Sequence, residues 1–551
     1  MKLDYKDGKE EKFVSEKSFV KGAIVLSIAG ILAKCLGALY RIPFARIASD
    51  ECGAIYALVY PVYNLLLALS TAGIPLAISK LVAEYEKQGK SGMSLRILKL
   101  SLLLLSSIGI LVAVGLFISA DWIATNVWEV PGAAISLRVI TPAMIFTCIQ
   151  AVFRGYFQGM QQMVPTALSQ ITEQFVRVGV IFAALFLLMP YGDEITAAGA
   201  TAGATVGSGV ALLLMLTIYF VYQKKQKQDP SMACRMDDLK NSISNSQVLQ
   251  KVVTLAIPIA IGSLVLPVMQ SIDSILVLTR LQAGGMSLDA ALIAFNYLGN
   301  CVQPIINLPF MITTAVAASL VPNISEALAM GYKEKVRETF ANAMQLAILI
   351  VLPATVGLMS LATPIMEMLY EKPGAGVPMF WSAAVVLVVG LYQISAGTLQ
   401  GMGKAMVPMY SLLIGATVKI VLTYTLTAMP IFGIRGAAIG SVIGFAIAAG
   451  NNVYQVSRKI GWGWLSMKYH VVKPGISVIA MAVLVLVSYS GLYSMLHSNG
   501  LATLGSIMVG GCGYFIVLLA IGGVSLEIIR KVPKVGNKVA TLLSKLNLVR
   551  E

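Results

Sequence analysis

Charged residues are scarce in this chain of 551 residues, and the scarcity excludes several classes of protein. Asp, Glu, Lys and Arg make up 12% of the sequence, whereas an ordinary soluble domain has about one quarter. There are only two histidines, His470 and His497, and both fall near predicted loop ends, so the sequence indicates no metal site or acid–base centre. The six cysteines show no CxxC spacing, which favours neither a disulfide framework nor a zinc site. We interpret them as reduced thiols.

Apolar residues are abundant instead. They form 57% of the chain, and the mean hydropathy is +0.80, as expected of an integral membrane protein. Stretches of about 20 apolar residues predict about fourteen transmembrane helices. The predicted spans are 22–46, 53–80, 97–119, 133–155, 163–189, 196–222, 252–280, 289–322, 337–362, 378–400, 405–429, 434–457, 473–492 and 503–529.

Composition also divides the chain into segments. The polar start lacks a small-residue cleavage site after a short apolar core, so we expect a retained cytoplasmic tail rather than a signal peptide. A polar Ser/Asn-containing stretch in the middle predicts a connector between two lobes. The expected segments are a tail (1–21), an N-lobe of helices 1–6 (22–222), a cytoplasmic connector (223–251), a C-lobe of helices 7–12 (252–458), helices 13–14 (459–529) and a basic cytoplasmic tail (530–551).

The two lobes resemble each other in sequence. Gln158-Gly159-Met160 recurs as Gln400-Gly401-Met402 at the same turn of each half, and Arg177 and Lys419 then fall within one position of equivalence. Six is an even number of helices, so both halves begin on the same side of the membrane. We therefore predict an all-α membrane protein with two six-helix lobes, related by a parallel pseudo-two-fold repeat, plus two C-terminal helices.

The net charge of +15 is distributed in alternate loops, which argues against a nucleic-acid partner. Basic loops lie at 80–99, 224–251, 333–337 and 458–473 and in the tail from 530, whereas the intervening loops carry acidic residues. The positive-inside rule then predicts a multi-pass protein with both termini in the cytoplasm. Lys372 and Arg435 are exceptions, because they fall in loops that the alternation places outside.

Helix breakers occur at matching places in the second helix of each lobe. They are Pro61, Gly73 and Pro75 in one lobe and Gly299, Pro304 and Pro309 in the other. Broken backbone at membrane depth survives only where protein or a water-filled cavity covers it. Both helices are therefore predicted to line the interface between the lobes.

The first predicted helix carries a cationic stripe. Lys34 and Arg41 are seven residues apart, nearly two helical turns, so they share one face, and Arg46 lies at the edge of the span. Charge inside a membrane is costly and usually faces a wet cavity or a partner, so the stripe predicts a path for an anion. An internal ion pair or snorkelling to the interface is the alternative, and the edge position of Arg46 suits snorkelling.

Helix seven carries a second pair of charges with the same spacing, Asp273 and Arg280. Asp273 either carries a coupling proton or sodium ion or neutralises a neighbouring cation, and the sequence leaves both open. Arg280 is interpreted as an interface anchor on the same helix as Asp273, the candidate for ion coupling.

Helix five carries Glu173 and Arg177, which form an i,i+4 pair in the favourable orientation. This pair is either a structural salt bridge or a gate that breaks and re-forms. Arg138 and Arg154 are interpreted as membrane-edge anchors of helix four.

Four segments of the chain resemble the Gram-positive branch of the MurJ-like and SpoVB-like polysaccharide flippases, in the superfamily that also holds the MATE exporters. They are AKCLGALYRIPFARI (33–47), GIPLAISKLVAEY (73–85), FRGYFQGMQQMVPTALSQITEQFVR (153–177) and LVPNISEALAMG (320–331). The resemblance implies a MATE-like fold with a central cationic cavity that opens alternately to the two sides of a bacterial cytoplasmic membrane. Its best-known substrate is lipid II, an undecaprenyl-pyrophosphate-linked peptidoglycan precursor.

The family's basic motif of helix one matches Lys34, Arg41 and Arg46, and the family's helix-eight arginine position falls on Asn300. The resemblance implies a transporter rather than an enzyme, without a cofactor, with the coupling ion left open between proton and sodium. Its implied partners are the lipid-linked oligosaccharide, membrane lipids and the cell-wall synthesis machinery, and the chain is expected to act as a monomer.

The function expected from residues and resemblance together is a lipid II flippase. Another lipid-linked glycan, such as a teichoic-acid, capsule or spore-related unit, is the alternative. An exporter of cationic drugs is the less favoured reading. Such a protein would need carboxylates inside the membrane, whereas helix one presents positive charge. A membrane glycosyltransferase would need a carboxylate or metal motif, for which Asp237-Asp238 is the one weak candidate. A non-transporting scaffold would leave the cationic stripe unexplained.

Overall fold

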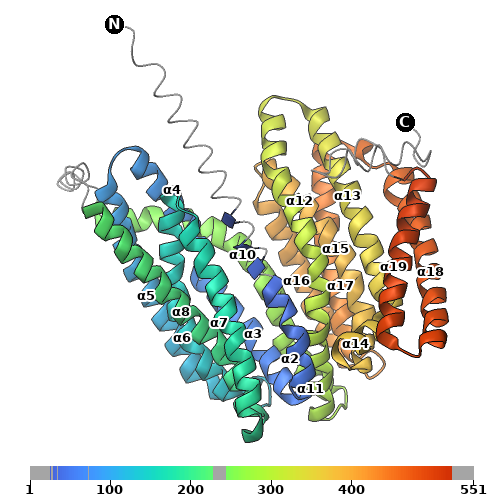
Figure 1. The fold of residues 1–551 in the computed structure, drawn as a ribbon. Helices are drawn as coiled ribbons and strands as arrows, with labels where there is room; N and C mark the ends of the chain where they lie inside the picture. Colours follow the sequence, from blue (N-terminus) through green and yellow to red (C-terminus); the bar gives the residue numbers. More distant parts are fainter. Residues whose placement is uncertain are drawn as a thin grey trace. The chain divides into compact units, whose positions relative to one another are not determined.

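The computed structural model describes residues 25–26, 29–30, 32–33, 35–71, 73–227 and 244–523, without the side chains of 225–227, 258–263 and 265–266. These residues are nearly all helical, and no β-strand occurs among them (Figure 1). Twelve of the helical segments are long and apolar enough to cross a membrane. Two of the fourteen predicted spans are not among these twelve. Span 22–46 contains residues that are not described, and span 252–280 contains residues whose side chains are not described. The all-α membrane fold is thus confirmed.

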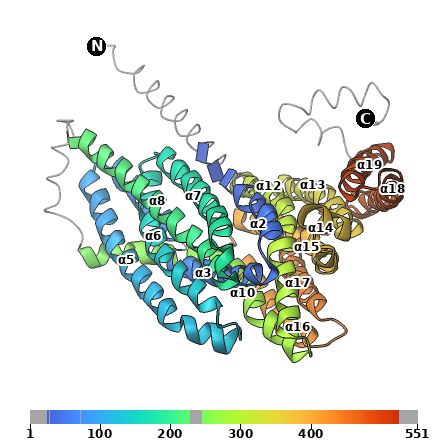
Figure 2. The ribbon, with the colours of Figure 1, turned by 60° about the horizontal axis from the view of Figure 1, so that its bottom comes forward.

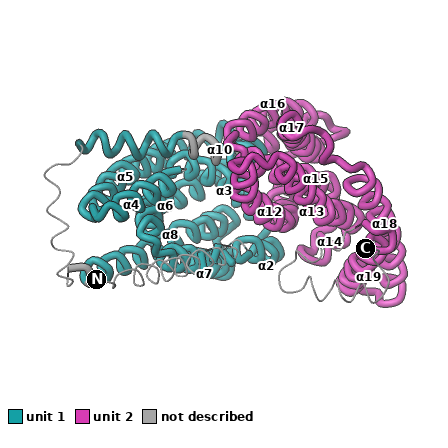
Figure 3. The backbone as a smooth tube through the Cα atoms, turned by 90° about the horizontal axis from the view of Figure 1, so that it is seen from above, with its two compact units in different colours: residues 1–275 teal, residues 276–551 magenta. Residues whose placement is uncertain are grey.

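Two compact units divide the chain, Met1–Ile275 and Leu276–Glu551 (Figure 3). The division falls inside one long helix, α10, rather than at the predicted connector 223–251, because the start of α10 packs on the first unit. There Val248 and Val252 join the core of that unit, and the Lys251 ammonium lies 3.3 Å from the Tyr85 hydroxyl. Residues 228–243 of the connector lie outside the described residues.

Unit 1 is a bundle in which α6 contacts α4, α5 and α8, and α7 packs along α8 (Figures 1 and 2). Its core is built from apolar side chains of α4, α5, α6, α8 and the start of α10. Its helices are α2 (Arg41–Ile47), α3 (Asp50–Thr71), α4 (Ile74–Lys87), α5 (Ser91–Trp122), η1 (Ile123–Val127), α6 (Ala133–Gly159), α7 (Val164–Leu188), η2 (Met189–Tyr191), α8 (Asp193–Lys227) and the first part of α10 (Asn245–Ala283).

Unit 2 repeats this arrangement with α15 at its centre, between α12, α13 and α17, and adds the neighbouring helices α18 and α19 (Figure 1). The predicted pair of extra helices is confirmed here. The helices are α11 (Leu288–Asn296), η4 (Tyr297–Val302), α12 (Gln303–Ala329), α13 (Lys333–Ser360), α14 (Ala362–Tyr370), η5 (Pro373–Ala375), α15 (Gly376–Gly401), α16 (Met406–Thr427), α17 (Ile434–Ile460), η6 (Trp462–Trp464), η7 (Lys468–Val472), α18 (Lys473–Leu496) and α19 (Asn499–Ala520).

The predicted helix breaks are confirmed, but not every proline makes one. In the first lobe the helix ends at Thr71 and resumes at Ile74, with Gly73 at φ 76°, a conformation that suits glycine. Pro61 stays inside α3. In the second lobe a π-helical segment covers Gly299, and Pro304 begins the helix that follows. Single π-turns often accompany functional positions.

The internal repeat is visible in how glycines seat one helix on another. A Cβ on Gly155 or Gly159 of α6 would come within 2.7 Å of Pro75 O or 2.8 Å of Ser79 O of α4, so these helices touch through their backbones. In unit 2, Gly397 and Gly401 meet the carbonyls of Ala317 and Val321 in the same way, at 2.7 and 2.9 Å. The same displacement along the chain relates every member of the two sets. Small residues allow this close approach in the absence of a hydrophobic driving force within lipid.

Candidate functional site

The candidate site is a buried polar network inside unit 1. Helices α3, α6 and α7 each supply side chains one turn apart and therefore on one face, and two further residues come from the start of α2. Its members are Gln150 and Arg154 of α6, Ser169, Glu173 and Arg177 of α7, and Tyr56, Tyr60 and Tyr63 of α3, with Tyr40 and Arg41 at the start of α2.

Glu173 is the central anion of this network. Its Oε1 lies 2.8 Å from Arg177 Nη2 and its Oε2 lies 2.9 Å from Arg154 Nη2, so one carboxylate is shared by two guanidinium groups. The side chains of Arg154, Glu173 and Arg177 are exposed to 17, 11 and 7%. Charge-assisted hydrogen bonds are strong in such a poorly solvated place, and removing one partner leaves a buried charge without compensation.

Arg154 is held on all sides by α6 and α7. Besides Glu173, it donates to Ser169 Oγ at 3.1 Å and to Gln150 Oε1 at 2.7 Å, and Gln150 in turn donates to the Ser208 carbonyl of α8. The prediction that Arg154 is a membrane-edge anchor was therefore wrong. The predicted fourth helix, α6, continues to Gly159, so Arg154 lies more than one turn inside it. There the Glu173 carboxylate of the neighbouring helix α7 is within reach.

A row of tyrosines on α3 connects this ion network to Arg41, the cation at the start of α2. Tyr60 accepts a hydrogen bond from Arg177 Nη1, and its ring centre lies 5.8 Å from the guanidinium carbon of Arg177 and 5.8 Å from that of Arg41. Tyr56 stacks on Tyr60 at 5.5 Å, and its hydroxyl is 2.7 Å from that of Tyr40. Cation–π attraction and shared hydroxyls thus hold two arginines at one ring.

The network brings several guanidinium groups together. Glu173 pairs with Arg154 and Arg177, and Arg41 and Arg177 both lie against the ring of Tyr60. Arg177 Nε is buried without a hydrogen-bond acceptor among the described residues. Guanidinium groups with tyrosine hydroxyls beside them suit an oxyanion such as a phosphate. The arrangement can bind such an anion or exchange it for Glu173.

The remaining predicted site residues lie in several places. Lys34 is outside the described residues. Arg46 is exposed at the end of α2. Asp273 is half-buried on the unit 1 part of α10, two residues after Ser271, whose Oγ donates to the Pro61 carbonyl at 3.0 Å.

Arg280 and Asn300 belong to unit 2. Arg280 Nε donates to the Tyr424 carbonyl at 3.1 Å, and its guanidinium carbon lies 3.9 Å from the Tyr424 ring centre. Asn300 is buried in the π-helical segment, where its Nδ2 donates to Asn296 Oδ1 at 2.8 Å. Arg138, the other predicted edge anchor, pairs with the exposed Asp121 and covers the Phe117 ring.

Among the predicted site residues, unit 1 therefore brings together Arg41 and the Glu173–Arg177 pair, which were predicted independently of each other. The sequence interpretation missed the tyrosines that join them. Their signal was present, because Tyr56, Tyr60 and Tyr63 recur at helical spacing on one face of an otherwise apolar span.

Unit 2 holds an apolar cavity of about 330 Å³ between α12, α13, α14, α18 and α19. Its walls include Leu308, Pro309, Leu358, Met481 and Ile507. No charged side chain lines it, so it suits an alkyl or prenyl chain rather than a polar group.

A family model described as "Polysaccharide biosynthesis protein" matches residues 19–328, and one described as "MatE" matches residues 258–425. Among curated relatives from Bacillus subtilis (strain 168), the uncharacterized membrane protein YabM is 31% identical, over 95% of this chain and 96% of its own length. Stage V sporulation protein B is 28% identical, over 95 and 99%. The lipid II flippase MurJ is 26% identical, over 81 and 84%.

Solved structures share the fold. An inward-facing MATE-family multidrug transporter of the MOP superfamily has a TM-score of 0.65 at 16% identity, covering 80% of this chain and 98% of its own. The lipid II flippase MurJ in an inward closed conformation has a TM-score of 0.62 at 15% identity, covering 90 and 98%. The expected MATE-like fold is therefore confirmed, since these neighbours align over most of both chains.

Proposed function

Because the chain belongs to the polysaccharide biosynthesis protein family, we propose that it is a flippase for an undecaprenyl-pyrophosphate-linked oligosaccharide, with lipid II as the substrate. It would carry the headgroup from the inner to the outer leaflet of the cytoplasmic membrane, with both termini in the cytoplasm. The observation that supports this most is the meeting of two guanidinium groups, those of Arg41 and Arg177, at the ring of Tyr60.

The transport problem is to move a large anionic headgroup across hydrocarbon while its lipid tail stays in an apolar environment. In the proposed mechanism Arg41, together with Lys34 and Arg46 of the same predicted span, binds the diphosphate through the planar fork of its guanidinium. An inside-negative potential assists the outward movement of an anion, whether or not a proton or sodium ion on Asp273 adds to it.

Glu173 gives the network its proposed gate. The carboxylate already has two guanidinium partners, so an incoming phosphate can take Arg177 while Glu173 keeps Arg154. A shared ion pair with two arrangements of similar energy is a two-state element that substrate can bias. Arg280 and Asn300 would act in unit 2, as an anchor and as a headgroup contact.

A different lipid-linked glycan is the second candidate substrate, and it has its own support. Two of the relatives that match over 95% of this chain are a sporulation protein and an uncharacterized membrane protein. Neither name specifies lipid II. The chemistry at Arg41 is the same for both candidates, because both carry a prenyl diphosphate.

The decisive experiment uses a cell in which this protein is the sole flippase and measures lipid II exposed on the outer leaflet. We expect normal exposure with the natural protein, a loss of at least about tenfold with Arg41→Gln, and partial recovery with Arg41→Lys, which keeps charge but not the fork. Arg138→Gln is the matched control, since its guanidinium pairs with Asp121 at a helix end. Unchanged exposure with Arg41→Gln would sink the role in binding, and absence of exposure with the natural protein would shift the proposal to another glycan.

A further inference from the structure

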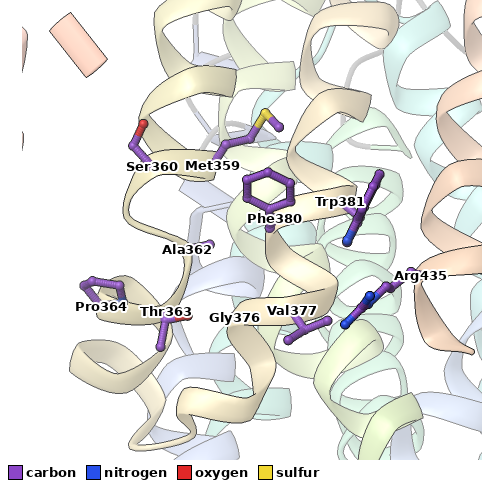
Figure 4. Close-up of a pocket in the computed structure, with 10 residues that line it drawn as sticks. All are labelled: Met359, Ser360, Ala362, Thr363, Pro364, Gly376, Val377, Phe380, Trp381 and Arg435. Atoms are coloured by element: carbon purple, nitrogen blue, oxygen red, sulfur yellow. The ribbon is translucent and has the colours of Figure 1, made fainter. Parts of the chain in front are cut away.

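One pocket of unit 2 lies apart from the network and from the apolar cavity. It has a volume of about 370 Å³ and opens where α13 ends and where α14, α15 and α17 begin (Figure 4). The opposite ends of α13 and α17 carry the basic residues of the predicted cytoplasmic loops, Lys333 to Arg337 and Arg458 to Lys459. The pocket therefore lies at the far end of these helices, which the proposed orientation places outside the cell.

Arg435 gives this pocket its charge. It is one of the two cations that break the alternation of basic loops, and the flippase mechanism does not use it. Figure 4 shows its side chain extending from α17 toward the start of α15, near Val377 and below Trp381. No acidic side chain forms an ion pair with it within the described ranges. A guanidinium in this position is available to an anion.

The rest of the lining combines hydroxyls with aromatic rings. Ser360 at the end of α13 and Thr363 in the first turn of α14 line the pocket on the side away from Arg435 (Figure 4). Phe380 and Trp381 contribute rings that lie edge to face, with centres 5.7 Å apart, and the two side chains are still 40 and 39% exposed. Aromatic residues of this kind gather at the headgroup level of a membrane, where one side of the ring is apolar and the other wet.

The floor of the pocket is formed by tightly packed helix starts. A Cβ on Gly376 would come within 2.3 Å of Thr363 Oγ1 and 2.7 Å of its Cα, so α14 and α15 are in direct contact at their first turns. The positive ends of these two helix dipoles and of α17 thus add to the charge of Arg435.

We propose that this pocket binds the phosphate of a lipid headgroup in the outer leaflet. Arg435 would pair with the phosphate oxygens, and the rings of Phe380 and Trp381 would cover the apolar part of the headgroup. Two lipids carry this chemistry, an anionic phospholipid that resides in the leaflet and a prenyl diphosphate that has just been carried across. The second source rests on the proposed function, whereas the first rests only on the proposed orientation.

The test measures binding and not transport, so that its outcome is independent of the Arg41 experiment. Purified full-length protein is titrated separately with phosphatidylglycerol and with undecaprenyl diphosphate, and the bound lipid is counted by native mass spectrometry. Arg435→Gln should weaken binding of at least one of the two about tenfold, the loss expected for a charge-assisted hydrogen bond, and Arg435→Lys should restore part of it. Lys372→Gln is the matched control, because it removes a cation from the same end of unit 2 but not from the pocket.

The outcomes separate the two sources. An Arg435-dependent loss confined to phosphatidylglycerol identifies the resident lipid, and a loss confined to undecaprenyl diphosphate identifies the carried lipid. Equal affinity of natural protein and Arg435→Gln for both lipids would overturn the proposal, as would an equal loss with Lys372→Gln. The melting temperature of each variant shows that a loss of binding does not come from unfolding.

Discussion

Arg177 of α7 and Lys419 of α16 occupy the same position of a helix pair that occurs once in each unit. A Cβ on Gly207 would meet the Glu173 carbonyl at 2.7 Å and the Arg177 Cβ at 3.3 Å. In unit 2, a Cβ on Gly444 would meet the carbonyl of residue 415 at 2.7 Å and the Lys419 Cβ at 3.0 Å. Both cations are buried, but the position of Glu173 is taken by a glycine, Gly415, in the second unit. The carboxylate at this position therefore belongs to unit 1 and not to its repeat.

Replacing that carboxylate tests whether it is a gate. Glu173→Gln keeps the shape of the side chain but leaves Arg154 and Arg177 without their shared anion. We expect the transport rate per molecule to change by more than the amount of protein in the membrane, because the substrate no longer competes with a carboxylate for Arg177. The comparison needs lipid exposure and immunoblots from the same cells. A drop in abundance with normal transport per molecule would show a structural salt bridge instead.

The hydroxyl of Tyr60 is the direct link between the ion network and the ring beside Arg41. Tyr60→Phe keeps both cation–π contacts but removes the acceptor for Arg177 Nη1. A lost hydrogen bond to a charged group costs about 1.5–3 kcal/mol, so the melting temperature of the detergent-purified protein should fall by several degrees. Transport should fall with it if the link carries the response of Glu173 to a bound headgroup.

Tyr63→Phe is the control for this experiment. Tyr63 lies on the same face of α3, with its ring centre 5.9 Å from that of Tyr60, but the Arg177 hydrogen bond goes to Tyr60. A smaller effect on melting and transport is expected. Equal effects of the two substitutions would assign the loss to packing of the tyrosine row rather than to the link.

The glycine contacts of the repeat predict matched losses of stability in the two units. Gly207→Ala and Gly444→Ala each place a methyl group 2.7 Å from a backbone carbonyl of the neighbouring helix, and overpacking of this kind costs about 1–3 kcal/mol. Gly450→Ala, in the same helix as Gly444, meets nothing within 4 Å and should be neutral or stabilising by up to about 1 kcal/mol. Thermal melting of the three variants measures this. Tolerance of both crowded substitutions would mean that the helix pairs separate more easily than their contacts indicate.

Much of the fold could be predicted because the bilayer restricts what a chain can do. Long apolar runs must be helices, since no other structure satisfies the backbone in hydrocarbon, and the recurrence of Gln158-Gly159-Met160 at Gln400 was enough to predict the repeat. The breaks near Gly73 and Gly299 were predictable for the same reason. The ends of helices were less so: Arg154 was assigned to an edge because α6 runs one turn further than its hydropathy indicates.

The site divides along the same line. Pairs on one helix, such as Glu173 with Arg177, follow from helical spacing. The sharing of Glu173 with Arg154, and the contact of Tyr60 with both Arg41 and Arg177, depend on how α2, α3, α6 and α7 pack. Spacing along a chain specifies which residues share a face of one helix, whereas the rotation and depth of neighbouring helices arise from the packing of all their side chains together. The pattern of apolar and charged residues therefore determines the helices of this protein and the faces of each. Which charged side chains come into contact is decided by the packing of the folded bundle.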